Sequence, residues 1–178
     1  RYMVVDGAGR FVSQRTDPAL ATVRVLAVAP VLRLECEGLS PLVVEVGEGG
    51  AVREVAVWDD RVAALSCGAA AAAWFTRLLG RPAELVVMPE PSPRPVDPRF
   101  AGPGHRVGFA DGYPVLVLSA AAVDVLNRRL AVPVGFDRFR PNLVVEGCPP
   151  HAEDGWRRIR AGGAVLELVK PCARCPVV

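Results

Sequence analysis

The first sixty residues alternate short apolar runs with glycine and proline, and this pattern limits the fold more than any other feature. The runs cover 2–5, 11–14, 21–28, 31–36, 42–46 and 52–57. Turn residues separate them at Pro30, at Gly38 and along 47–50. Short β-branched runs with this punctuation are typical of an antiparallel sheet or barrel. We therefore expect a mainly β module at the start of the chain.

A change of period indicates one helix after this module. The apolar positions Ala71, Trp74, Phe75 and Leu78 follow the i, i+3, i+4, i+7 spacing of a helix face. The sequence therefore predicts a helix over 66–79, with Ser66 as its N-cap and Gly80 just beyond its end. A buried strand at 85–88 should follow.

The next stretch is rich in proline and predicts a connection between two modules. Residues 89–104 hold six prolines, which favour an extended loop. Beyond it, apolar runs at 115–118, 143–145, 156–159 and 165–169 predict further strands. Ser119 can cap a second helix that ends before Pro133. We expect modules at 1–88 and 105–178, and a mainly β (α+β) fold with two or more short helices.

Charge and hydropathy exclude several kinds of partner. The 178 residues carry 21 basic and 19 acidic side chains without any basic block, which argues against a nucleic-acid partner. No apolar run approaches the roughly 20 residues of a membrane span, and the start of the chain has no signal-peptide architecture. We expect a soluble, cytoplasmic protein with no membrane partner.

The cysteines carry the first candidate site. The chain has five, at Cys36, Cys67, Cys148, Cys172 and Cys175. An odd number without a secretory signal indicates reduced thiols. Cys172 and Cys175 form a C-x-x-C that admits four interpretations. A zinc site would need a second ligand pair, and a thioredoxin-like pair would need a helix after it, where Pro176 stands. The others are two inert thiols, or one thiolate bound to a soft metal with Arg174 holding an anion beside it.

Arginine and asparagine form a second candidate cluster. Arg138 and Arg140, two apart on a segment expected to be extended, should point the same way and form a fork for phosphate. Asn142 adds a donor and an acceptor that could bind the edge of a heterocycle. The alternative is a pair of surface arginines that form salt bridges with Asp137 or Glu153.

Three further sites have both a functional and a structural interpretation. Glu153 and Asp154 could act as an acid/base pair, or cap a turn. In the Asp111–Gly112 turn the glycine lets backbone amides approach a ligand, although D-G before tyrosine and proline is also an ordinary turn. Cys67 at a helix start could be an activated thiol or a packed one.

Taken in order, these motifs resemble the MOSC family. Arg1 to Asp6, Gly9 to Val12 and Gln14-Arg15 resemble its N-terminal β-barrel module. Phe109, Asp111 to Pro114, Ser119, Leu126-Asn127, Arg138 to Asn142, Ala152 to Asp154 with Trp156, and Cys172 to Cys175 resemble the MOSC domain, a β-barrel, in the branch that reduces amidoximes. The resemblance covers essentially the whole chain.

The resemblance implies an enzyme with a molybdenum–molybdopterin cofactor and no pyridoxal phosphate. Its metal ligand corresponds to Cys175, and its pterin and phosphate contacts correspond to Arg140, Asn142, Arg174, Ala173, Asp111 and Gly112. Glu153 or Asp154 would donate a proton. Lys170, the only lysine in the chain, has no role in this scheme.

The activity implied is the reduction of N-hydroxylated compounds, namely amidoximes, hydroxylamines and N-hydroxypurines. Electrons would come from a separate reductase or iron–sulfur protein. A cofactor carrier or sulfur-transfer module is the alternative, which the lack of a desulfurase-like segment in these residues disfavours. The chain starts without Met and stops three residues after Cys175, so we also expect part of the cofactor site to lie beyond both ends, which leaves the activity of this stretch alone open.

Overall fold

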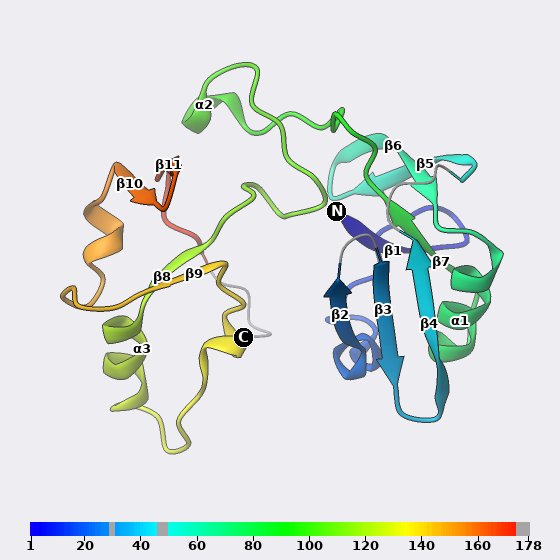
Figure 1. Cartoon of the computed structure of the whole chain (residues 1–178), viewed down its shortest axis with the longest axis horizontal. Coiled ribbons are helices and arrows are strands. Elements are labelled where there is room, and N and C mark those ends of the chain that lie inside the picture. Colours follow the sequence, from blue (N-terminus) through cyan, green and yellow to red (C-terminus); the bar gives the residue numbers. More distant parts are fainter. Residues whose placement is uncertain (29–30, 46–49, 174–178) are drawn as a thin grey trace. The chain divides into compact units, whose positions relative to one another are not determined.

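The computed structural model describes residues 1–28, 31–45 and 50–173 (Figure 1). Its contacts divide the chain into two compact units. The first, unit 1, comprises Arg1–Pro95 and Arg106–Asp111. Unit 2 comprises Val96–His105 and the residues from Gly112 onward. The chain therefore passes between the units three times, at positions 95, 105 and 111.

Unit 1 consists of two antiparallel sheets and a helix. Its elements are β1 (Tyr2–Asp6), the 3-10 helix η1 (Pro18–Thr22), β2 (Arg24–Val28), β3 (Val31–Cys36), β4 (Leu39–Glu45), β5 (Val52–Val57), β6 (Asp60–Ser66), α1 (Ala69–Leu79) and β7 (Ala83–Val87). One sheet has the strand order β1-β7-β6-β5 and the other has β2-β3-β4. Strand β6 was not expected, because its alanines have low strand propensity and only pairing with β5 and β7 fixes it.

Two apolar clusters fill unit 1, and β7 contributes to both. Leu85 joins the cluster that α1 and the three-stranded sheet share, through residues such as Trp74 and Leu34. Val86 joins the cluster of β1, β5 and β6. Successive strand residues point to opposite faces, so one strand holds both halves of the core. The Trp74 Nε1 also donates to the Ser40 carbonyl at 2.8 Å and fixes α1 against β4.

The helix of unit 1 begins later than the sequence predicts. Its N-cap is Gly68, with φ +90°, and the expected N-cap Ser66 instead ends β6. The Ser66 Oγ accepts a hydrogen bond from the Gly68 amide at 3.0 Å. Pairing of Ser66 with β7 holds this residue in the sheet, so the prediction for Ser66 was wrong. The helix ends at Gly80 as expected, in the left-handed conformation.

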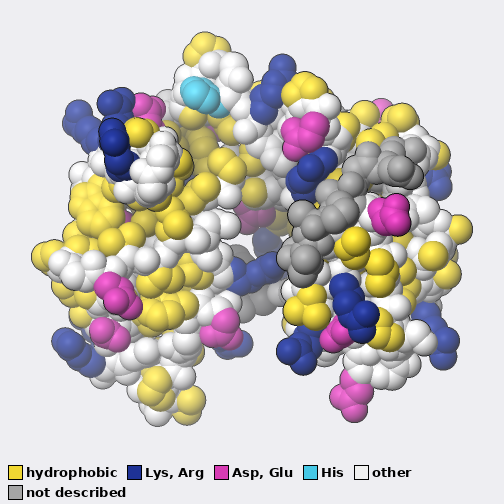
Figure 2. All heavy atoms as spheres, in the orientation of Figure 1, with side chains coloured by type: hydrophobic (Ala, Val, Ile, Leu, Met, Phe, Trp, Pro, Cys, Tyr) yellow, Lys and Arg dark blue, Asp and Glu magenta, His cyan; other side chains and the backbone are white. Residues whose placement is uncertain are grey.

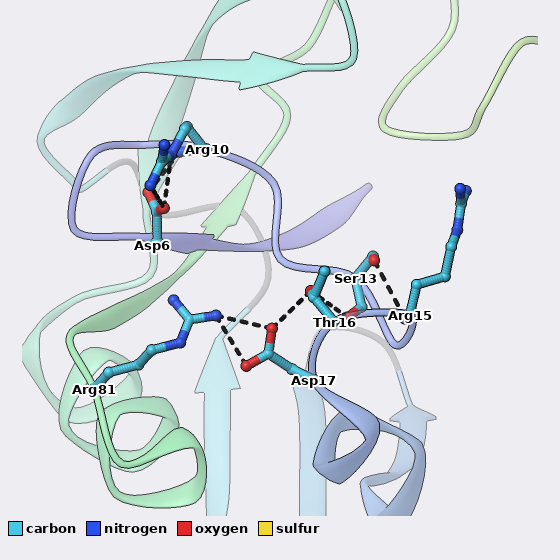
Figure 3. Close-up of polar contacts among 7 residues, drawn as sticks. All are labelled: Asp6, Arg10, Ser13, Arg15, Thr16, Asp17 and Arg81. Carbon is cyan, nitrogen blue, oxygen red and sulfur yellow. Dashed lines mark hydrogen bonds and ion pairs between the residues drawn. The ribbon is translucent and has the colours of Figure 1, made fainter.

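Two polar contacts order the N-terminal part of unit 1: Asp6 closes a tight turn, and Asp17 binds Arg81, which follows α1 (Figure 3). The Asp6 carboxylate accepts from the amides of Ala8 and Arg10 and from Arg10 Nε, each at 2.9 Å. Gly9 has φ +76°, and a Cβ there would lie 2.7 Å from the Glu54 carbonyl oxygen, so only glycine fits. Arg81 Nη2 reaches both Asp17 oxygens, at 2.9 and 2.8 Å.

Unit 2 consists of short elements. They are α2 (Pro98–Ala101), β8 (Val117–Ser119), α3 (Ala120–Asn127), the 3-10 helices η2 (Phe136–Arg138) and η3 (Ala152–Gly155), β9 (Leu143–Val145), β10 (Arg158–Ala161) and β11 (Ala164–Glu167). Strands β8 and β9 pair in parallel, and β10 and β11 pair antiparallel. The proline-rich stretch, predicted to be loop throughout, contains α2. Asp97 caps this helix by accepting from the Arg99 amide at 3.0 Å, and Pro98 suits its first turn.

The described residues confirm the mainly β (α+β) class with short helices. No helix in this part of the chain combines the length and the apolar character needed to cross a lipid bilayer. Unit 2 leaves apolar side chains on its surface (Figure 2). They include Leu130, Val132, Phe136, Val144 and Val165.

Candidate cofactor-binding site

Asn142 lies at the start of β9 and braces the residue that precedes β8. The amides of Asn142 and Leu143 donate to the Leu116 carbonyl at 2.9 and 3.1 Å. The Asn142 Oδ1 accepts from the Leu116 amide at 2.8 Å. The carboxamide oxygen is therefore used within the fold, whereas the exposed Nδ2 donates to no other described residue. Asn142 can therefore donate a hydrogen bond to a ligand from Nδ2, whereas its Oδ1 already accepts one from Leu116.

Arg140 adopts a backbone conformation that is unusual for its place in the sequence. It follows η2 with φ +51°, and its amide donates to the Phe136 carbonyl at 3.1 Å. A residue before proline ordinarily prefers the extended region. A left-handed non-glycine residue costs about 1–3 kcal/mol and persists where the surrounding structure enforces it, often at binding sites. The strain therefore marks Arg140 as a residue held in place.

The two arginines differ from the sequence-based expectation. Arg138 belongs to the 3-10 helix η2, so the 138–140 segment is turned rather than extended, and the prediction of an i, i+2 fork along a strand was wrong. Both side chains are exposed. Within the described ranges neither forms a salt bridge with Asp137 or Glu153. The guanidinium of Arg140 is therefore open to an anionic ligand.

Glu153 is one of the few buried charged residues, and it fixes the junction between β8 and α3. Its Oε1 accepts from the Ser119 amide at 2.7 Å, and the residue is 9% exposed. Ser119 is the N-cap residue, as predicted, but its side chain makes no capping hydrogen bond, and the Glu153 carboxylate takes the amide instead. Burial alone would raise the pKa of Glu153, but the hydrogen bond from the Ser119 amide favours the carboxylate, and the pKa is lowered. Glu153 is thus ionised at neutral pH and suited to hold α3.

Asp154, next to Glu153, is exposed to solvent. Its amide closes the η3 turn by donating to the His151 carbonyl at 3.1 Å. The two neighbouring carboxylates are therefore not an equivalent pair. The proton-donor role of either stays a prediction.

The buried side chain of Arg94 binds the backbone at and before the Asp111–Gly112 turn. The sequence did not indicate this role for Arg94. Arg94 donates to the carbonyls of Gly108, Ala110 and Asp111 at 3.0, 2.6 and 3.3 Å. Its Nε donates to Asp60 at 2.6 Å. Arg94 stands in an irregular Ser-Pro-Arg-Pro run, so no sequence periodicity marks it as buried. Asp111 belongs to unit 1 and Gly112 to unit 2.

The structure describes only the first half of the C-x-x-C motif. Ala173 and Cys172 are exposed, whereas Arg174 and Cys175 lie outside the described residues. No cluster of three or more His, Cys, Asp or Glu that could hold a metal occurs at 1–28, 31–45 or 50–173. Burial, followed by the nearby Glu84 carboxylate, raises the pKa of Cys67 to about 11, so its thiol is not activated.

The parallel β8–β9 pair brings two predicted site residues to one element. Asn142 contacts Leu116, ahead of β8, while Glu153 contacts Ser119, the last residue of β8. The two residues therefore mark opposite ends of this strand pair. Asn142 and Arg140 are the pair available to a ligand, and Glu153 supports the frame.

Family models that match both parts of the chain define it as a MOSC protein. The family model described as the MOSC N-terminal beta barrel domain matches residues 1–82, and the MOSC domain model matches residues 104–178. The chain belongs to the MOSC family. The sequence resemblance is thus confirmed.

Similarity to individual curated proteins supports the family assignment. The chain is 30% identical over 180 residues to mitochondrial amidoxime-reducing component 1 of Homo sapiens, covering 98% of this chain and 53% of that protein. It is 28% identical to mitochondrial amidoxime reducing component 2 of Rattus norvegicus, covering 98% and 54%. It is 27% identical over 206 residues to molybdenum cofactor sulfurase of Oryza sativa subsp. japonica, covering 99% and 24%. The chain spans about half the length of the amidoxime-reducing relatives and about a quarter of the sulfurase.

Proposed function

We propose that this chain binds a molybdenum–molybdopterin cofactor and forms part of an oxidoreductase that reduces N-hydroxylated compounds such as amidoximes, hydroxylamines and N-hydroxypurines. Two relatives that are named for amidoxime reduction align with nearly the whole chain. A third is named for the molybdenum cofactor. No pyridoxal phosphate enters this proposal.

The donor set of unit 2 fits such a group. A free guanidinium at Arg140 suits a phosphate, and the Asn142 Nδ2 suits an acceptor on a heterocycle. A cysteine thiolate is the ligand that a soft metal prefers. The strained and unpaired Arg140, next to the half-used amide of Asn142, is the observation that carries the proposal.

Each remaining residue has one role in this scheme. Cys175 holds the metal, and Arg174 stabilises the thiolate beside it. The backbone of Ala173 and of the Asp111–Gly112 turn provides further contacts with the cofactor. When bound, the cofactor supplies the redox chemistry that removes oxygen from the substrate nitrogen.

The proton donor in this scheme is Asp154 rather than Glu153. Glu153 is buried, and its carboxylate is engaged by the Ser119 amide, so it is not placed to exchange a proton with solvent or substrate. Asp154 is exposed to solvent, so it can take up a proton from water and pass it to a substrate. We assign Glu153 a positioning role only.

The partners of the reaction are also proposals. Electrons come from a separate reductase or iron–sulfur protein, and the substrate is a small N-hydroxylated molecule. Neither a nucleic acid nor a membrane takes part. The cytoplasm is the proposed compartment.

The likeness to molybdenum cofactor sulfurase supports a second candidate, a cofactor carrier or sulfur-transfer module. In that case Cys175 binds the cofactor or carries sulfur, and no amidoxime is reduced. The two candidates share the binding site and differ in turnover.

Metal and pterin analysis of the intact protein, followed by benzamidoxime reduction with an artificial electron donor, separates these candidates. We expect bound molybdenum, bound molybdopterin and turnover. Cofactor-loaded protein that reduces neither amidoximes nor N-hydroxypurines supports the carrier. Protein that binds no molybdopterin contradicts both.

Single cysteine variants test the metal ligand. Cys175→Ala should lose turnover and most of the bound molybdenum, because the metal loses its protein thiolate. Cys172→Ala, the matched control, should keep most of both. Equal losses from the two substitutions would indicate zinc or a redox pair instead.

A further inference from the structure

The only lysine of the chain lies against two aromatic rings of unit 2. The Lys170 Nζ is 4.9 Å from the ring centroid of Phe100 and 5.9 Å from that of Tyr113. Both distances lie within the range in which an ammonium is attracted to the face of an aromatic ring. The three residues come from distant parts of the sequence, so the contact joins three segments.

The two rings are themselves held in place. Phe100 belongs to α2, whose N-cap Asp97 binds the backbone and side chain of Arg99. The Tyr113 hydroxyl donates to the Asp97 carbonyl at 3.3 Å. The rings therefore form a fixed receptor for a cation, which we call the Phe100–Tyr113 clasp.

The charges around the clasp favour an ammonium there. Hydrogen bonds from the Arg99 side chain and backbone are the main cause that lowers the pKa of Asp97 to about 2. Asp97 is thus a carboxylate at any working pH, and it partly offsets the positive charge of Arg99. The Arg99 guanidinium also lies 5.7 Å from the ring centroid of Phe100. Lys170 therefore enters a site where Asp97 balances the charge of Arg99 and the rings face a second cation.

Lys170 lies between the end of β11 and the C-x-x-C, so fixing its side chain affects the path of the residues that follow. Strand β11 ends at Glu167, and the Leu168 amide still donates to the Arg157 carbonyl at 3.0 Å. Pro171 then restricts the backbone of Lys170 as well as its own. Fixing the Lys170 side chain therefore limits the directions in which Cys172 and Ala173 can leave β11.

We propose that Lys170 is a positioning residue, which anchors Cys172 and Ala173, the described residues of the C-x-x-C, by placing its ammonium in the Phe100–Tyr113 clasp. This inference rests on the proposed function and deepens it, since the anchored residues precede the proposed metal ligand in the sequence. Lys170 itself contacts neither metal nor substrate in this scheme. Its contribution is to limit the directions that Cys172 and Ala173 take from β11 before the cofactor binds.

The clasp can be observed directly at the Lys170 nitrogen. Reductive methylation with ¹³C-formaldehyde keeps the positive charge of Lys170 and adds an NMR probe to its nitrogen and to every other free amine. The resonance that is missing from Lys170→Met belongs to Lys170. We expect the methyl resonance of the wild-type protein to lie upfield, owing to the ring currents of Phe100 and Tyr113. Phe100→Leu should move it towards the position of a free lysine. A wild-type resonance at the free-lysine position overturns the proposal without any variant.

The positioning effect is measured by thiol alkylation with mass spectrometry. In Lys170→Met the alkylation rate of Cys172 should rise about two- to fivefold, the factor expected from losing one partly exposed cation–π contact. Lys170→Arg keeps a cation that can stack on the rings and should restore the wild-type rate. An equal rate in wild type, Lys170→Met and Lys170→Arg overturns the proposal.

Cofactor retention separates failure of this proposal from failure of the proposed function. Lys170→Met should retain molybdopterin several-fold less well than wild type and Lys170→Arg. If the wild type retains molybdopterin and Lys170→Met retains it equally, the positioning role is overturned and the proposed function stands. If the wild type binds none while the NMR and alkylation results hold, the anchoring by Lys170 is supported and the proposed function fails.

Discussion

Burial decides what two adjacent carboxylates in η3 can do. Glu153 is buried, and its Oε1 takes the amide of Ser119, whereas Asp154 faces solvent. The hydrogen bonds that Glu153 accepts favour its ionised form in the folded protein and lower its pKa below the ordinary 4.5. At the scale of the residue, one carboxylate stabilises the fold, and its neighbour in the sequence remains open to solvent.

Glu153→Gln should therefore destabilise the protein by roughly 1–3 kcal/mol at neutral pH, since a charged acceptor is lost to a buried amide. A lowered pKa contributes stability that is present above pH 4.5 and is lost as pH falls through the pKa of the folded protein. Urea unfolding across this range should show a steeper acid loss for the wild type than for Glu153→Gln. Asp154→Asn, the exposed control, should stay within about 0.5 kcal/mol of the wild type. Parallel acid losses in the wild type and Glu153→Gln would contradict this role.

At the scale of elements, one arginine side chain orders an irregular segment. Arg94 is 5% exposed at its side chain, and it joins the β5–β6 hairpin, through Asp60, to the carbonyls of 108, 110 and 111. These carbonyls have no regular partner strand to satisfy them, so the guanidinium takes that place. The Asp111–Gly112 turn is thus a product of a tertiary contact.

Arg94→Leu should destabilise the protein by about 2–4 kcal/mol, because three carbonyls and the Asp60 carboxylate lose their donor while the leucine fills similar volume. Thermal unfolding measures the loss. Asp60→Asn is the matched control, and its loss should be smaller, since the Asp60 side chain is 48% exposed and water can replace the partner. A larger loss from Asp60→Asn than from Arg94→Leu would show that the carbonyl contacts contribute little.

At the scale of the whole molecule, the two units differ in how much they bury. Both apolar clusters lie in unit 1, where β7 carries Val86 at 0% exposure. Strands β10 and β11 of unit 2 contain only exposed and intermediate residues. Local opening requires less free energy where fewer apolar side chains are buried.

Hydrogen exchange should show this difference. The amides of β1 and β7 should exchange slowest, close to the limit set by global unfolding, and those of β10 and β11 much faster. Exchange followed by mass spectrometry on the intact protein tests the order. Equal protection of β7 and β11 would mean that unit 2 is stabilised by contacts other than those of the described residues.

The sequence by itself determined the mainly β class, most strands of unit 1, and the face of α1 that Trp74 and Phe75 occupy. Those features depend on local periodicity and turn residues, which act over a few positions. The sequence also identified the Arg-Pro-Asn and C-x-x-C motifs as candidate sites, because their residue types limit the chemistry they can perform.

Only the tertiary structure decided that Ser66 ends a strand, that Glu153 holds α3, that Arg94 supports the Asp111 carbonyl and that Lys170 meets two rings. Each of these outcomes depends on a partner far away in the sequence, and periodicity contains no information about which distant groups meet. Burial, hydrogen bonding and charge then fix each role, because a polar group removed from water must find a partner.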